Sequence, residues 1–197
     1  MLEVFHPYIR TNRNQFIAQV EVLSRRLGIL PEWMLGVMWI ESRIRPEAVN
    51  PVSGATGLIQ FMPATARSLG TTTEALRNMS NLQQLHFVDL YFRPHSGRMN
   101  SFFDVYFAVF FPIAIGRPDN WVLQAQGLSA ELIARQNPAF DTTGSGQITV
   151  GEVKKVISGI LERNLGWNPN AQKTAAGIGI GFAILAVGLL VHFLTKK

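Results

Sequence analysis

The sequence predicts an all-α fold followed by one long apolar segment. Apolar residues recur at helical spacing in several stretches before residue 165. Proline and glycine stand at the edges of these stretches, where helices start and stop. No alternation of apolar and polar residues is long enough to indicate a strand. We therefore expect helices joined by short polar loops.

The first two helices are expected over residues 12–28 and 31–45. In the first, apolar residues follow a helical period and Gly28 ends the pattern. In the second, Pro31 suits the first turn, and Pro46 cannot continue a helix. The next stretch, RPEAVNPVSGATG, is rich in Pro, Gly, Asn and Ser and is expected to form a loop.

Further helices are expected along the middle of the chain. A short one begins at Pro63 and closes at Gly70, and residues 72–92 predict one or two more. The aromatic-rich segment 101–116 contains an aspartate and a proline, which leave it too short to span a membrane. This segment is therefore predicted to be a buried core helix.

The C-terminal region predicts a membrane anchor. Residues 174–195 contain no Asp, Glu, Lys or Arg and are followed by Lys196 and Lys197. A helix of that length matches a hydrocarbon core of about 30 Å. A polar linker is expected over residues 166–173, and the flanking lysines favour a cytoplasmic C-terminus. The N-terminal residues lack the apolar stretch of a signal peptide, so a single-pass protein with a C-terminal anchor is expected.

Composition excludes several classes of partner and site. The chain has no cysteine, which excludes disulfides and Cys-ligated metal sites. Its net charge is +5, and the basic residues are scattered singly rather than in runs. This pattern suits a solvated surface or loose attraction to an acidic polymer, and it does not predict a nucleic-acid partner.

One carboxylate stands at the end of an unusually apolar helix. In WMLGVMWIES, the residues one turn before Glu41 are Val37 and Met38, and those two turns before are Trp33 and Met34. Burial on such a face would raise the pKa of Glu41, as a general acid at neutral pH requires. The alternative is a glutamate at a helix end that simply faces solvent.

Two motifs together resemble a known family. Glu41 and Ser42 at a helix end, a loop, and then GLIQFMPATA over residues 57–66 resemble the lytic transglycosylases with the lysozyme-like SLT fold. Ile59 replaces the methionine usual in that second block. The segment YFRPHSGRMNSFFDVYFAVFFPIAIGRPDN resembles the phage-encoded branch of this family. The resemblance extends over about residues 25–160.

The resemblance implies an activity and a single catalytic residue. Such enzymes cleave the β-1,4 bond between N-acetylmuramic acid and N-acetylglucosamine in peptidoglycan. Glu41 would donate a proton to the glycosidic oxygen, and the muramyl C6 hydroxyl would attack to leave a 1,6-anhydro product. A tethered nucleophile removes the need for the second acid of other glycosidases. The nearest other acids, Glu47, Asp89 and Asp104, lie on no second catalytic motif, and no cofactor is expected for catalysis.

The resemblance also implies substrate-binding residues. Ser42 would position Glu41 or a sugar, although a serine at a helix end can instead bond the backbone. Gln60 would face the saccharide groove or hold its own loop. The family's Ala-Tyr-Asn box is missing here, since the corresponding stretch reads VFFPIAIG. Tyr106 is therefore a loose candidate for the substrate contact.

A second motif has the spacing of an EF-hand calcium loop. The ligand positions fall on residues of PAFDTTGSGQITVGEV: Asp141, Thr143, Ser145, Gln147 and Glu152. Gly146 and Ile148 also fit the pattern. Hydroxyls replace two of the usual carboxylates, which predicts weak Ca²⁺ binding in the millimolar range or a loop that keeps its turn without metal. We expect a lysozyme-like domain over 1–127 and a helix-loop-helix over 128–165.

The anchor carries a row of small residues. Gly177, Gly181 and Gly188 share one helix face, and the first two form a GxxxG pattern that allows close helix packing. A homo-oligomer through this face is one hypothesis. A second row of Ala and Gly on roughly the opposite face weakens that signal.

These observations predict a membrane-anchored peptidoglycan lytic transglycosylase. Because the substrate lies outside the cytoplasm and no signal peptide is expected, we place the protein in the internal membrane of a lipid-containing phage virion, acting at cell entry or exit. One alternative is a goose-type lysozyme, which would use the same acid but add water. Another is a structural virion or membrane protein on an inactive scaffold. A third is a calcium sensor built on the EF-hand-like loop.

Overall fold

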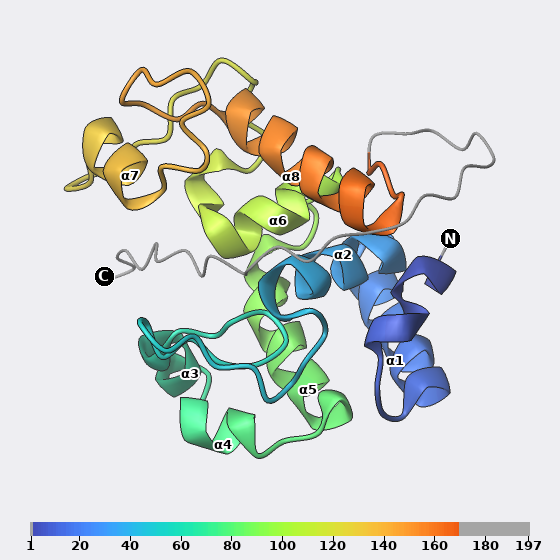
Figure 1. Ribbon diagram of the computed structural model, residues 1–197. Helices are drawn as coiled ribbons and strands as arrows, with labels where there is room; N and C mark the ends of the chain where they lie inside the picture. Colours follow the sequence, from blue (N-terminus) through green and yellow to red (C-terminus); the bar gives the residue numbers. More distant parts are fainter. Residues whose placement is uncertain (1, 170–197) are drawn as a thin grey trace.

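The computed structural model describes residues 2–169, and this part of the chain is helical (Figure 1). Its helices are the 3₁₀ helix η1 (Leu2–Tyr8), α1 (Arg13–Leu27), α2 (Pro31–Ser42), α3 (Pro63–Ser68), α4 (Thr73–Arg77), α5 (Asn81–Phe92), η2 (Arg93–His95), α6 (Phe102–Phe110), η3 (Pro112–Ala114), α7 (Ala130–Gln136) and α8 (Val150–Leu165). Within residues 2–169, β-type backbone pairing occurs only as isolated bridges. The all-α prediction is confirmed over these residues.

The predicted membrane span 174–195, with its glycine face, lies outside the described residues. Among residues 2–169, no helix has the length and apolar character that a membrane crossing needs. The aromatic segment predicted to be a core helix is α6, and most of its side chains are buried. That prediction is therefore confirmed.

Helix α2 lies at the centre of the fold and contacts η1, α1 and α6. Every residue from Met34 to Trp39 is buried. The helix begins at Pro31 as expected but ends at Ser42, three residues earlier than the sequence predicts. It ends there because Arg43 and Ile44 both take left-handed backbone conformations, each with φ 57°. Their N–H groups bond back to Trp39 O and Met38 O, which caps the helix directly after Glu41 and Ser42.

The segment 72–92 forms two helices rather than one. Ser80 begins α5 with a capping box, in which its hydroxyl accepts from the Gln83 N–H and the Gln83 side chain accepts from the Ser80 N–H. Helices α3 and α4, with the loop that precedes them, form the lower part of the molecule in Figure 1. This loop contacts the C-terminal end of α2, where the Ser42 hydroxyl lies 2.9 Å from Leu58 O, so the two motifs of the sequence meet in space.

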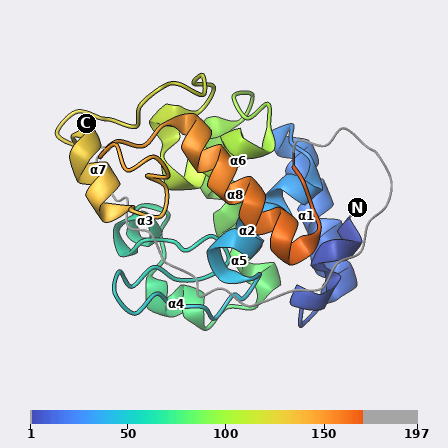
Figure 2. The ribbon, with the colours of Figure 1, turned by 45° about the horizontal axis from the view of Figure 1, so that its top comes forward.

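Helix α8 runs beside α2 and α6, as both views show (Figure 1 and Figure 2). Just after α8, the ring of Trp167 packs edge-on against Phe5 and Phe102, with centroid distances of 5.3 and 5.2 Å. It also lies directly over Gly36, where an added Cβ would be 2.5 Å from the indole ring. Only glycine allows this approach to the middle of α2.

Trp167 lies in the expected linker but packs into the core of the folded part. The predicted linker 166–173 includes this residue, yet Trp167 is 5% exposed. Buried residues on both sides of the expected boundary at residue 127 belong to one hydrophobic core. The sequence does not predict this burial, because it depends on partners that lie far away along the chain.

Candidate active site

Glu41 lies in the last turn of α2, after a run of buried apolar residues. Its side chain is partly exposed, and within residues 2–169 its carboxylate has no hydrogen bond and no ion pair. Although part of the residue reaches solvent, the loss of hydration around its carboxyl raises the pKa of Glu41 to about 8. At neutral pH this carboxyl is therefore mainly protonated, the state a general acid needs.

Two tyrosines interact electrostatically with this carboxyl. Burial raises the pKa of Tyr91 and of Tyr106, and the negative charge of Glu41 raises both further. The Tyr91 hydroxyl donates to Ala108 O at 3.0 Å, which links α5 to α6. Tyr106 is 4% exposed and stacks on Phe110, with ring centroids 5.6 Å apart. Both phenols therefore stay neutral and add no charge to the surroundings of the acid.

Ser42 bonds the backbone rather than pointing outward. Its buried hydroxyl lies 3.1 Å from Met38 O and 2.9 Å from Leu58 O, and it accepts from the Arg45 N–H at 3.2 Å. The sequence left open whether Ser42 positions Glu41 or a sugar, or bonds the backbone. These contacts correspond to bonding the backbone. The hydroxyl joins the end of the helix that carries Glu41 to the GLIQ loop.

The GLIQ loop (residues 57–60) is a tight turn closed by paired backbone hydrogen bonds between Thr56 and Phe61, at 3.0 and 2.8 Å. Gly57 and Gln60 have left-handed φ values of 87° and 53°. For a glutamine this conformation is strained, and such strain gathers at functional sites. The Gln60 amide nitrogen donates to Gly57 O at 3.1 Å and to Ala48 O at 3.3 Å. These contacts hold the loop, while the amide oxygen makes no hydrogen bond within residues 2–169.

Gln84 is a residue that the sequence analysis missed. This side chain on α5 is 0% exposed. Its amide oxygen accepts from the Leu58 N–H at 2.8 Å, and its nitrogen donates to Pro46 O and Leu76 O, both at 2.7 Å. The signal available in the sequence was a glutamine on the helix face that also carries Val88 and Phe92. A polar group at such a position must find buried partners.

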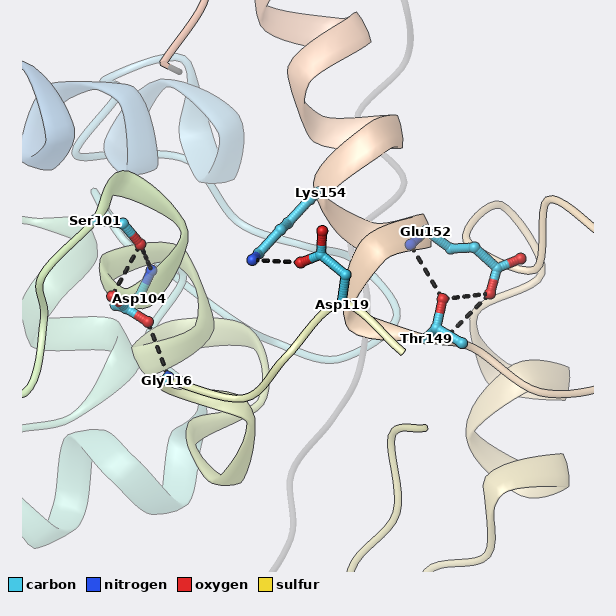
Figure 3. Close-up of polar contacts among 7 residues, drawn as sticks. All are labelled: Ser101, Asp104, Gly116, Asp119, Thr149, Glu152 and Lys154. Carbon is cyan, nitrogen blue, oxygen red and sulfur yellow. Dashed lines mark hydrogen bonds and ion pairs between the residues drawn. The ribbon is translucent and has the colours of Figure 1, made fainter. Parts of the chain in front are cut away.

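The other acids have separate partners. Asp89 forms ion pairs with Arg93 at 2.6 Å and Arg26 at 3.2 Å. Asp104 accepts from the Ser101 hydroxyl at 2.8 Å and from the Gly116 N–H at 2.9 Å (Figure 3). It also accepts from the Asn100 N–H at 3.0 Å. Glu47 is exposed. Within residues 2–169, none of the three is bonded to Glu41, so the structure brings no second acid into contact with it.

The EF-hand-like loop is closed by hydrogen bonds around Glu152. Its carboxylate accepts from both the N–H and the hydroxyl of Thr149 (2.9 and 3.0 Å; Figure 3), and from Thr143 and Thr142. Burial alone would raise the pKa of Glu152, but these hydrogen bonds outweigh it and lower the pKa to about 2. Thr149 and Glu152 together form the capping box that begins α8.

The remaining predicted metal ligands lie in the same loop. The Asp141 carboxylate accepts from the N–H groups of Ser145 and Gly146, both at 2.9 Å, and the Ser145 hydroxyl donates to Gln147 O at 3.1 Å. Thus the loop's own donors occupy both carboxylates. Residues 2–169 contain no group of three or more His, Asp or Glu side chains that could hold a metal ion.

This loop is tied to the rest of the fold. Leu123 N–H donates to Ile148 O at 2.8 Å, and Val150 N–H donates to Trp121 O at 2.9 Å. Lys154 on α8 forms an ion pair with Asp119 at 2.7 Å (Figure 3). The start of α8 is therefore anchored to the segment that follows α6 and η3.

Comparison with known proteins points to the same part of the chain. Residues 20–85 match the family described as "Transglycosylase SLT domain". Over 59 residues the chain is 37% identical to "Membrane-bound lytic murein transglycosylase C" of Actinobacillus pleuropneumoniae, in the strains L20 (serotype 5b), JL03 (serotype 3) and AP76 (serotype 7). This alignment covers 30% of the chain and 16% of the length of each relative. The matched family segment contains Glu41, the GLIQ loop and Gln84.

Proposed function

We propose that this protein is a peptidoglycan lytic transglycosylase. The observation that carries the proposal is Glu41, a carboxyl with a pKa of about 8 and no charged partner among residues 2–169, in a segment that matches the SLT domain. A solitary, protonated carboxyl suits a glycosidase whose nucleophile belongs to the substrate. The similarity to lytic murein transglycosylases supports peptidoglycan as the substrate.

In the proposed reaction, Glu41 donates its proton to the glycosidic oxygen as the bond to the muramyl C1 breaks. The muramyl C6 hydroxyl then forms a bond to C1, and its proton passes to the Glu41 carboxylate. The acid is thereby restored and a 1,6-anhydro sugar leaves. The Tyr106 hydroxyl and the free amide oxygen of Gln60 are the polar groups that we propose contact the sugars, because neither has a hydrogen-bond partner within residues 2–169.

The rate of this reaction should fall at alkaline pH. Since Glu41 must be protonated and has a pKa of about 8, kcat/KM for release of soluble fragments from purified sacculi should be flat near neutrality. Above the pKa it should fall about tenfold per pH unit. Melting curves at each pH would separate ionisation from unfolding. A kcat/KM that rises through pH 9 would contradict the assignment.

Two other readings make different predictions. A hydrolase of goose-lysozyme type would show the same pH dependence but give reducing-end products. A structural protein on an inactive scaffold would release no fragments from sacculi at any pH. The missing Ala-Tyr-Asn box is the observation that favours this second candidate.

We also propose that residues 174–195 anchor the enzyme in the internal membrane of a lipid-containing phage virion, with the catalytic part facing peptidoglycan. The uncharged span with its following lysines supports an anchor, and the name of the matched relative describes it as membrane-bound. Association of copies through Gly177, Gly181 and Gly188 would follow from close helix packing. Detection in the inner membrane of uninfected cells, and absence from purified virions, would contradict the virion location.

The EF-hand-like loop is proposed to bind Ca²⁺ weakly. Asp141 and Glu152 are its two carboxylates, and Glu152 is ionised at neutral pH because its pKa is about 2. Binding must replace hydrogen bonds that already satisfy both groups, so about 10 mM Ca²⁺ should raise the free energy of unfolding by only about 1 kcal/mol. Asp141→Asn should remove this effect. Equal melting temperatures in Ca²⁺ and in chelator would contradict the proposal.

A further inference from the structure

We infer that Gln84 is a positioning residue for the proposed reaction, acting on Glu41 through Leu58 and Ser42. The inference rests on the proposed function, and it concerns a side chain that touches neither the acid nor any group assigned to the substrate. Three segments meet at this amide: the loop after α2, the GLIQ loop and the end of α4.

The Gln84 amide is fully buried and makes three short hydrogen bonds, at 2.7, 2.7 and 2.8 Å. Both of its N–H donors and its oxygen are used, so this side chain has one favourable orientation. Such a satisfied, buried polar group fixes the relative positions of its partners more strictly than apolar packing does. Gln84 therefore fixes the position of the Leu58 N–H relative to α5.

Leu58 passes this constraint to the acid. Its N–H is held by Gln84, and its C=O lies 2.9 Å from the Ser42 hydroxyl. Ser42 is the neighbour of Glu41 and closes α2. One residue, Leu58, and one hydroxyl thus separate the buried amide from the helix turn that carries the acid.

Gly57 shows how closely the loop fits this amide. A Cβ added at Gly57 would lie 2.5 Å from the Gln84 amide oxygen. The φ of Gly57 is also 87°, a conformation that other residues take only with strain. Glycine at this position is needed both for the turn and for the approach of Gln84 to the Leu58 N–H.

The effect of this chain of contacts should appear in kcat. The proton donor must lie within hydrogen-bond reach of the glycosidic oxygen, and displacement of a catalytic group by about 1 Å can cost about 100-fold in rate. Gln84→Met keeps the length of the side chain but removes every hydrogen bond of the amide. We expect a 10- to 100-fold lower kcat with little change in KM.

Asn81→Leu is the matched control. Asn81 lies on the same helix, is 2% exposed, and donates to Thr11 O at 2.8 Å, away from the GLIQ loop. Both variants lose a buried amide, so both should melt at lower temperature than wild type. At a temperature where both remain folded, only Gln84→Met should lose kcat.

Ser42→Ala extends the test to the middle of the chain of contacts, and it removes only one hydroxyl. In a double-mutant cycle, Gln84→Met and Ser42→Ala should lower kcat less together than the product of their separate effects. If wild type is active, two results would overturn the positioning role alone. One is an unchanged kcat in Ser42→Ala, and the other is an equal loss of kcat in Gln84→Met and Asn81→Leu. A wild type that releases no fragments would overturn the proposed function, and the positioning role with it.

Discussion

Glu41→Gln is expected to lower kcat for release of peptidoglycan fragments by about 10³-fold or more while the fold remains intact. The amide is nearly the same size as the acid but can neither give up a proton to the glycosidic oxygen nor take one from the C6 hydroxyl. Both proton transfers of the proposed reaction pass through this one group, so no other residue can substitute for it. Turbidity of sacculus suspensions measures the loss directly.

The same variant should also be more stable than wild type at alkaline pH. The pKa of Glu41 is about 8 in the folded protein against a model value of 4.5. Between these values the unfolded chain has released the proton and the folded chain still holds it, so the free energy of unfolding of wild type falls as pH rises. The free energy of unfolding of Glu41→Gln relative to wild type should therefore be higher at pH 9 than at pH 4. Because part of the side chain stays solvated, we expect this difference to be about 1–3 kcal/mol.

Glu47→Gln is the matched control for both measurements. Glu47 is an exposed acid a few residues further along the chain. Its amide variant should leave fragment release unchanged and should show the same pH dependence of stability as wild type. Parallel curves of stability against pH for wild type and Glu41→Gln would contradict the raised pKa of the acid, whatever the activity.

Trp167→Ala is expected to destabilise the whole folded part by about 3–5 kcal/mol. Its ring fills the space between Phe5, Phe102 and Gly36, and it joins the end of α8 to the middle of the helix that carries Glu41. Because these contacts cross the sequence boundary expected at residue 127, the loss should lower one cooperative transition. Denaturant unfolding followed by circular dichroism measures it.

Trp33→Ala provides the comparison. Trp33 lies on the first turn of α2, is only partly buried, and packs at the edge of the core. We expect Trp33→Ala to lower the free energy of unfolding clearly less than Trp167→Ala does. Two separate transitions in the Trp167→Ala variant would show instead that residues 1–127 and 128–165 fold as independent units.

The features that the sequence predicts well are local. Pro31 starts α2, Gly28 follows α1, and the apolar run before Glu41 is enough to expect a desolvated carboxyl, since each depends on neighbours within one or two helical turns. The raised pKa of Glu41 follows from burial alone and needs no distant charged partner among residues 2–169.

The features that the sequence does not predict depend on distant partners. The burial of Trp167 requires Phe5 and Gly36, and the role of Gln84 requires the backbone of Leu58. The early end of α2 depends on left-handed conformations at Arg43 and Ile44, which neither residue type favours by itself. In each case tertiary contacts decide a position that local pattern leaves open.

The mass of the released disaccharide fragments tests the central claim most directly. If Glu41 serves a nucleophile tethered in the substrate, wild type should release muropeptides that end in 1,6-anhydro-N-acetylmuramic acid, and Glu41→Gln should release none. Fragments one water heavier, with a reducing N-acetylmuramic acid end, would show that water is the nucleophile and would contradict the intramolecular reaction.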